Sequence, residues 1–162
     1  GVAESERQFL YGLLHDTGKL LLATVAPDEY KRTREIVATG VPVLEAERRF
    51  IGVEHTRVGA ALFEKWGLPS EYAQVAAYHH DPTNADPSTA LSVAATHVAN
   101  GLARAAVLGD EQWLGPVSPI MPEALLRLGA STDTFPELVA EAADALDEAA
   151  ESFGVQRETV AE

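Results

Sequence analysis

Apolar residues recur at helical spacing along nearly the whole chain, and this pattern leaves little room for any other fold class. From Ser5 to Val25 the apolar positions lie three and four residues apart, which places their side chains on one face of a helix. Later segments repeat the spacing between residues that start or stop helices, such as Pro27 and Gly67. The alternation typical of strands is weak everywhere. The sequence therefore predicts an all-α fold.

The predicted helices differ too much in length for a regular four-helix bundle, so we expect an irregular helical bundle. A chain of 162 residues is long enough for one domain with a buried core, and we expect a single domain over residues 1–162. The segment GDEQWLGPVSPIMP should form an irregular loop packed on the core, because it is apolar but contains two glycines and three prolines. The expected helices cover residues 5–25, 28–40, 42–52, 54–67, 69–80, 89–108, 122–129 and 135–154.

Composition excludes several kinds of site and partner. The net charge of −13 argues against a nucleic-acid surface, which needs lysine and arginine to neutralise phosphates, and against binding to anionic membranes. No apolar run is long enough to span a bilayer. The absence of cysteine rules out disulfides, thiolate zinc sites and cysteine nucleophiles. We therefore expect a cytoplasmic protein that binds neither nucleic acid nor membrane.

The five histidines suggest a shared chemical role. Each lies on a predicted helix, or at its end, among apolar neighbours, where an imidazole without a polar partner would be costly to bury. Imidazole and carboxylate ligands together suit zinc, iron or manganese. In LLHDTGKLLL, however, His15 and Asp16 would point about 100° apart around one helix. They would share an ion only from the inside of the bundle, or with Asp16 bridging two ions. A metal-free scaffold of packed histidines is the alternative.

Several stretches resemble the HDOD domain, the HD-related output domain of bacterial signalling proteins, which is part of the HD superfamily of metal-dependent phosphohydrolases. They are LYGLLHDTGKLLL, ERRFIGVEHTRVGAALFEKWGLPSEYAQVAAYHHDP and LLRLGA, and the resemblance runs from about Phe9 to Leu128. It implies a helical bundle with its metal-type residues gathered in the middle. Lys19 matches a motif lysine that can meet a phosphate, and Asp16 and Lys19 would be catalytic residues if the protein is an enzyme. The implied metal ligands are His15, Asp16, His55, His79 and His80.

The chain departs from the superfamily pattern in three places. No histidine precedes His15, although the superfamily has a ligand there, so we expect the sequence to begin part-way through a longer signalling protein and to lack its first helices. Asn100 occupies the position of a late aspartate, and its neutral amide binds divalent ions more weakly. His97 shares a helix face with Asn100 and is a further candidate ligand. The Gly-Tyr-Pro motif of the related cyclic-di-GMP phosphodiesterases is missing, which argues against that reaction.

Two functions follow from the resemblance. In the first, the domain is a signalling output or regulatory module with a degenerate metal site, and it binds a protein partner, a small ligand, or an upstream sensor or receiver domain. In the second, it is a metal-dependent phosphohydrolase acting on a phosphomonoester, a nucleotide or a cyclic nucleotide. The cofactor would be iron, manganese, zinc or magnesium, or none. The sequence does not indicate an oligomeric state.

Overall fold

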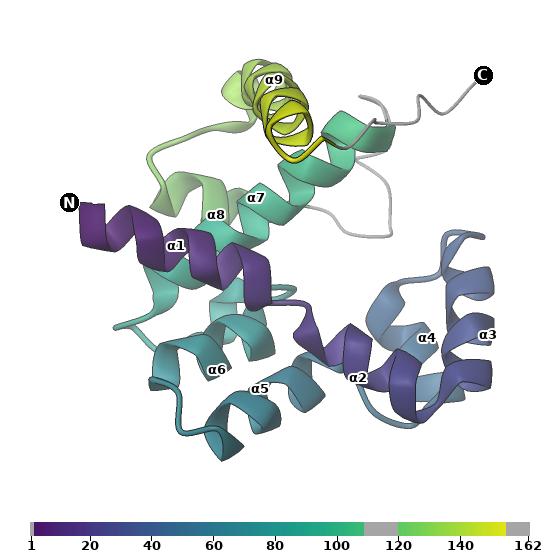
Figure 1. The fold of residues 1–162 in the computed structure, drawn as a ribbon. Helices are drawn as coiled ribbons and strands as arrows, with labels where there is room; N and C mark the ends of the chain where they lie inside the picture. The colour runs from purple at the N-terminus through teal and green to yellow at the C-terminus, as the bar shows by residue number, and fades with distance from the viewer. Residues whose placement is uncertain (1, 109–119, 155–162) are drawn as a thin grey trace.

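The computed structural model describes residues 2–108 and 120–154, and within them it contains helices, turns and no strand. This confirms the all-α prediction (Figure 1). The predicted loop at residues 109–122 lies mostly outside the described residues. The α-helices are α1 (Val2–Leu14), α2 (Thr17–Val25), α3 (Pro27–Val37), α4 (Val43–Phe50), α5 (His55–Lys65), α6 (Ser70–Tyr78), α7 (Ala90–Leu108), α8 (Pro122–Arg127) and α9 (Phe135–Ser152), with short 3₁₀ helices η1 (Pro82–Asn84) and η3 (Thr132–Thr134).

The prediction of one continuous helix over residues 5–25 was wrong, because the chain turns at His15 and Asp16. Helix α1 ends at Leu14 and α2 begins at Thr17, and Asp16 has the non-helical backbone angles φ −98° and ψ 9°. The Thr17 hydroxyl donates a hydrogen bond to the Leu14 carbonyl across the turn (2.7 Å). The break removes the constraint of about 100° between neighbours on one helix. His15 and Asp16 can therefore face the same point in space.

The remaining predicted helices are present, with ends that move by a few residues. The largest consequence is at α6, which was expected to continue to His80 and instead ends at Tyr78. His79 is the C-terminal cap and His80 follows in a turn. Helix α3 begins slightly earlier than expected, with Ala26 at the capping position and Asp28 in its first turn.

Helices α2, α5 and α6 pack together and place the loops that carry the histidines. Helix α5 packs on both α2 and α6, and α7 joins α1 and α6 to α8 and α9 (Figure 1). Helices α3 and α4 pack on each other and lie beyond α2. Hydrophobic contacts form one core cluster around α7, α8 and α9, and smaller clusters centred on Val75 and on Phe63. The segments that carry His55, His79 and His80 therefore lie beside the two smaller clusters and not beside the larger one.

Two glycines allow the close crossing of α2 and α5. A Cβ atom on Gly18 would lie 1.9 Å from the carbonyl oxygen of His55, and one on Gly59 would lie 3.4 Å from the Gly18 nitrogen. Only a residue without a side chain fits at Gly18. The crossing brings the N-terminus of α5 against the turn that carries Asp16. Among the described helices, none combines the length and apolar character that a membrane crossing requires.

Candidate metal centre

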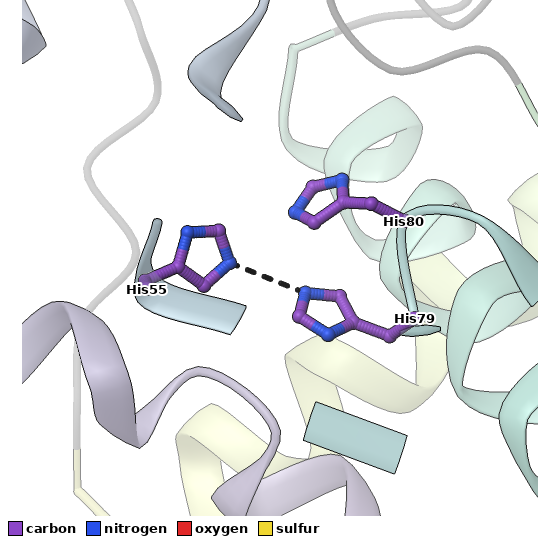
Figure 2. A group of neighbouring side chains, drawn as sticks. All are labelled: His55, His79 and His80. Atoms are coloured by element: carbon purple, nitrogen blue, oxygen red, sulfur yellow. Dashed lines mark hydrogen bonds between the residues drawn. The ribbon is translucent and has the colours of Figure 1, made fainter. Parts of the chain in front are cut away.

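The five residues expected as metal ligands lie together, although they come from three separate segments. His15 and Asp16 occupy the turn between α1 and α2, His55 is the first residue of α5, and His79 and His80 follow α6. Possible ligand atoms lie within 4.8 Å of one another in two overlapping groups, His55–His79–His80 and His15–Asp16–His79. Figure 2 shows the rings of His55, His79 and His80 around a common space. We call these five residues the metal-type cluster.

The Nε2 atoms of three histidines converge on the Asp16 carboxylate. Asp16 Oδ1 lies 3.3 Å from His55 Nε2 and 3.5 Å from His79 Nε2, and Asp16 Oδ2 lies 3.3 Å from His15 Nε2. His55 Nε2 and His79 Nε2 are 3.4 Å apart, and the dashed line in Figure 2 joins them. Two nitrogen lone pairs at this distance repel each other. Their approach therefore calls for a cation nearby, either a proton on one ring or a metal ion.

The opposite nitrogens of these rings are already committed as donors. His55 Nδ1 lies 2.8 Å from both oxygens of Glu47, His79 Nδ1 lies 3.0 Å from the Ala76 carbonyl, and His15 Nδ1 lies 2.7 Å from the Gly12 carbonyl. Carboxylate and carbonyl oxygens only accept, so each Nδ1 carries the proton. In the neutral ring, Nε2 then carries the lone pair. This is the arrangement in which protein histidines bind metal ions.

Burial keeps two of the rings neutral at pH 7. Desolvation lowers the pKa of His79 to about 4, despite the opposing effect of its contact with Asp16. Desolvation also lowers the pKa of His80 to about 2, assisted by the neighbouring His79 and His55. Neutral imidazole is the form that donates a lone pair to a metal.

For Asp16 and His55, contacts within the cluster outweigh the effect of burial on the pKa. Burial alone would raise the pKa of Asp16, but contacts with the three histidines and the charge of Lys19 outweigh it and hold that pKa well below its usual range. Burial would lower the pKa of His55, but its close contact with the Asp16 carboxylate and its hydrogen bonds to Glu47 prevail and raise it. The centre is therefore anionic at Asp16 and favours a cation at its middle.

A divalent ion fits the polar atoms that lack partners. Within the described residues, three buried side-chain atoms make no hydrogen bond: His15 Nε2, Asp16 Oδ1 and His80 Nε2. The short approaches to Asp16 Oδ1 therefore do not have hydrogen-bond geometry. Buried polar atoms are rarely unpartnered, since each costs about 1–3 kcal/mol. One or more ions coordinated by imidazole and carboxylate would satisfy all three atoms, and this donor set suits zinc, iron or manganese.

Lys19 lies at the edge of the metal-type cluster. Its Nζ is 2.6 Å from Asp16 Oδ2, and both side chains are partly buried. The ammonium therefore offsets the charge on the carboxylate oxygen that also contacts His15, while His55 and His79 approach the other oxygen. A role for Lys19 in holding a phosphate stays a prediction.

The two remaining candidate ligands lie on α7, and His97 has a different use there. Its Nδ1 donates to the His79 carbonyl (2.7 Å) and its Nε2 accepts from the Met121 amide (3.0 Å), so neither nitrogen offers a lone pair to a metal in this arrangement. His97 instead ties the end of α6 to the start of α8. Asn100 is half-buried one turn further along α7, and its coordination of an ion stays a prediction.

Sequence reasoning missed Glu47, which is fully buried on α4 and bonded to His55. A signal was present: in the expected helix 42–52, Glu47 lies on the same face as Val43 and Phe50, which are apolar. An acidic side chain on an apolar helix face needs a buried partner. The sequence did not show which of the histidines that partner would be.

Comparison with known proteins places the chain in a family. Residues 1–82, just over half of it, match the sequence model of the HDOD domain. An uncharacterized protein of Treponema pallidum (strain Nichols) is 28% identical over 74 residues, which make up 45% of this chain and 14% of that protein. The chain thus matches only a small part of that relative's length, and no solved structure matches significantly. On the family match, together with the clustered His-Asp and His-His residues, the chain belongs to the HDOD domain family.

Proposed function

We propose that this domain is a regulatory module of a bacterial signalling protein, and that a divalent metal ion in the metal-type cluster fixes the shape it presents to a partner. The observation that carries the proposal is that three imidazoles have their Nδ1 atoms committed and their Nε2 atoms turned toward Asp16. His15, Asp16, His55 and His79 would hold the ion, and His80 would complete its shell or bind a second ion. When bound, the ion supplies positive charge that joins the α1–α2 turn, α5 and the end of α6.

The same residues favour a regulatory role over catalysis. Asn100 replaces a carboxylate by a neutral amide, which weakens the ligand set and removes a base. Asp16 is shared with Lys19, so part of its charge is already neutralised. The partner would be a signalling protein, or a sensor or receiver domain of the same protein.

The first test is the metal content of protein purified without chelator and without a histidine tag. We expect near-stoichiometric zinc, iron or manganese by elemental mass spectrometry, and loss of the metal in the double variant His15→Ala/Asp16→Ala. Glu6→Gln is a matched control for loss of an acidic side chain, because Glu6 is exposed on α1. Well-folded protein without metal, even after incubation with each ion, would contradict the metal part of the proposal.

A second candidate function is a metal-dependent phosphohydrolase. The observation that favours it is the pair of overlapping ligand groups beside Lys19, since two ions and a lysine can stabilise charge on a phosphate ester. The metal-loaded protein should then hydrolyse p-nitrophenyl phosphate, bis-p-nitrophenyl phosphate or nucleotides. Lys19→Met should reduce turnover while the metal content stays unchanged. Absence of hydrolysis by protein with full metal content would leave the regulatory module as the better explanation.

A further inference from the structure

Glu47 is a buried carboxylate, and its side-chain hydrogen bonds within the described residues all go to His55. It is 0% exposed, and its Oε2 accepts from the main-chain N–H of His55 (2.8 Å), while both oxygens lie 2.8 Å from His55 Nδ1. Within the described residues, no lysine or arginine forms an ion pair with it. Burial of a carboxylate that has no lysine or arginine beside it is costly, and an apolar residue would serve packing better. Stability alone therefore does not explain why a glutamate occupies position 47.

The hydrogen bonds of Glu47 determine which nitrogen of His55 faces the cluster as an acceptor. An ionised carboxylate can only accept, so His55 Nδ1 must carry a proton. The bond from the His55 main chain anchors the carboxylate on the same residue and so fixes the angle of the ring. With Nδ1 occupied, the lone pair of the neutral ring lies on Nε2, which is directed at Asp16 Oδ1 and His79 Nε2.

We propose that Glu47 is the positioning residue of the metal centre: it holds His55 in the tautomer and orientation that a metal ion requires, and it connects helix α4 to that ion. This inference rests on the proposed metal site and deepens it by naming the residue that prepares His55 and the element that senses the ion. Partners of this kind, which hold the second nitrogen of a ligand histidine, also raise its basicity toward the metal.

The connection matters because α4 packs mainly on α3 and not on the helices that carry the metal-type cluster. The two helices form a hairpin that lies beyond α2, away from α6 and α7 (Figure 1). The Glu47–His55 contact therefore joins this hairpin (residues 27–50) to the metal-type cluster. A metal ion on Nε2 would withdraw electron density from the ring and make Nδ1–H a stronger donor. The hydrogen bond from His55 to Glu47 would then strengthen. Ion binding should then hold the hairpin more firmly.

The variant Glu47→Gln tests the positioning role with little change in shape. Its amide group can donate to Nδ1, which moves the ring proton to Nε2 and blocks the metal. We expect Zn²⁺ affinity, measured by isothermal titration, to fall roughly 10- to 100-fold. Glu45→Gln is the matched control, because it removes the same charge from the exposed face of the same helix and should leave affinity unchanged. Equal Zn²⁺ affinity in Glu47→Gln and the native protein would overturn the proposal.

A second measurement needs no variant and no metal. Long-range ¹H–¹⁵N NMR of the metal-free native protein, at a pH high enough to leave His55 neutral, should show its proton on Nδ1. A proton on Nε2 would overturn the positioning role, whether or not Glu47→Gln folds. If the native protein binds no Zn²⁺ but His55 has the Nδ1–H form, the proposed metal function fails while the effect of Glu47 on the ring stands.

The link to the hairpin has its own readout. Hydrogen exchange of amides in residues 27–50 should slow on addition of Zn²⁺ to the native protein and to Glu45→Gln. In the Glu47→Gln variant, at a Zn²⁺ concentration that saturates the variant, exchange of the same amides should slow by a smaller factor. An equal response in the saturated variant would overturn the connection through Glu47.

Discussion

Gly18 illustrates how a single residue decides whether the metal-type cluster can form. A Cβ atom there would lie 1.9 Å from the His55 carbonyl oxygen and 2.9 Å from the Gly59 nitrogen, and both are backbone atoms that cannot move aside. We expect Gly18→Ala to lower the free energy of unfolding by about 3 kcal/mol or more, because α2 must shift away from α5. Chemical denaturation followed by circular dichroism measures the change.

Gly12 provides the control for that substitution. It lies on α1, and a Cβ atom added there would meet nothing within 4 Å. Gly12→Ala should be neutral or should stabilise the protein by up to about 1 kcal/mol, since alanine favours a helix. Similar stability of the two variants would contradict the crossing of α2 and α5 described above.

His97 is expected to matter for stability and not for metal content. In His97→Ala, the His79 carbonyl and the Met121 amide lose their hydrogen-bond partner. We expect a loss of roughly 1–3 kcal/mol in the free energy of unfolding. In an isothermal titration with Zn²⁺, His97→Ala should bind as many ions per chain as the native protein does. Loss of Zn²⁺ with unchanged stability would instead support His97 as a ligand.

At the scale of elements, the helices were predictable and the break between α1 and α2 was not. Apolar spacing located each helix, because the pattern depends only on residues near in sequence. The same spacing continues through His15 and Asp16, so it gave no sign of the turn. The turn is stabilised by contacts of these residues with His55 and His79, which are distant in sequence. Such contacts override a local helical preference.

The packing of α7 on the segment before α8 gives an element-scale prediction. A Cβ atom on Gly101 would lie 2.3 Å from the Ile120 side chain. Gly101→Ala should cost about 1–3 kcal/mol by overpacking, and Ile120→Ala should cost about 2–5 kcal/mol by leaving a cavity. The double variant should cost less than the sum, because each change relieves the other. Additive costs in urea unfolding would show that the two residues are not in contact.

For the whole molecule, the proposed ion should act as a cross-link between segments far apart in the chain. Such an ion would bind only the folded arrangement, so Zn²⁺ at a free concentration a hundred times its Kd should add about 2.7 kcal/mol to the free energy of unfolding. A thermal melt should therefore move to higher temperature with Zn²⁺ and return with EDTA. The same addition to His15→Ala/Asp16→Ala should have no effect. A shift of equal size in that variant would indicate binding elsewhere on this acidic protein.

The sequence by itself determined the fold class and the approximate helices, because helical periodicity is a local pattern, and its resemblance to the HDOD domain named the residues that cluster. Only the tertiary structure decided how those residues face one another. The approach of the His55 and His79 Nε2 atoms to Asp16, the burial of Glu47 against His55, and the two hydrogen bonds of His97 all depend on where separate segments meet. A ligand and a structural histidine look alike in sequence, since only the third dimension shows which nitrogens are already bonded.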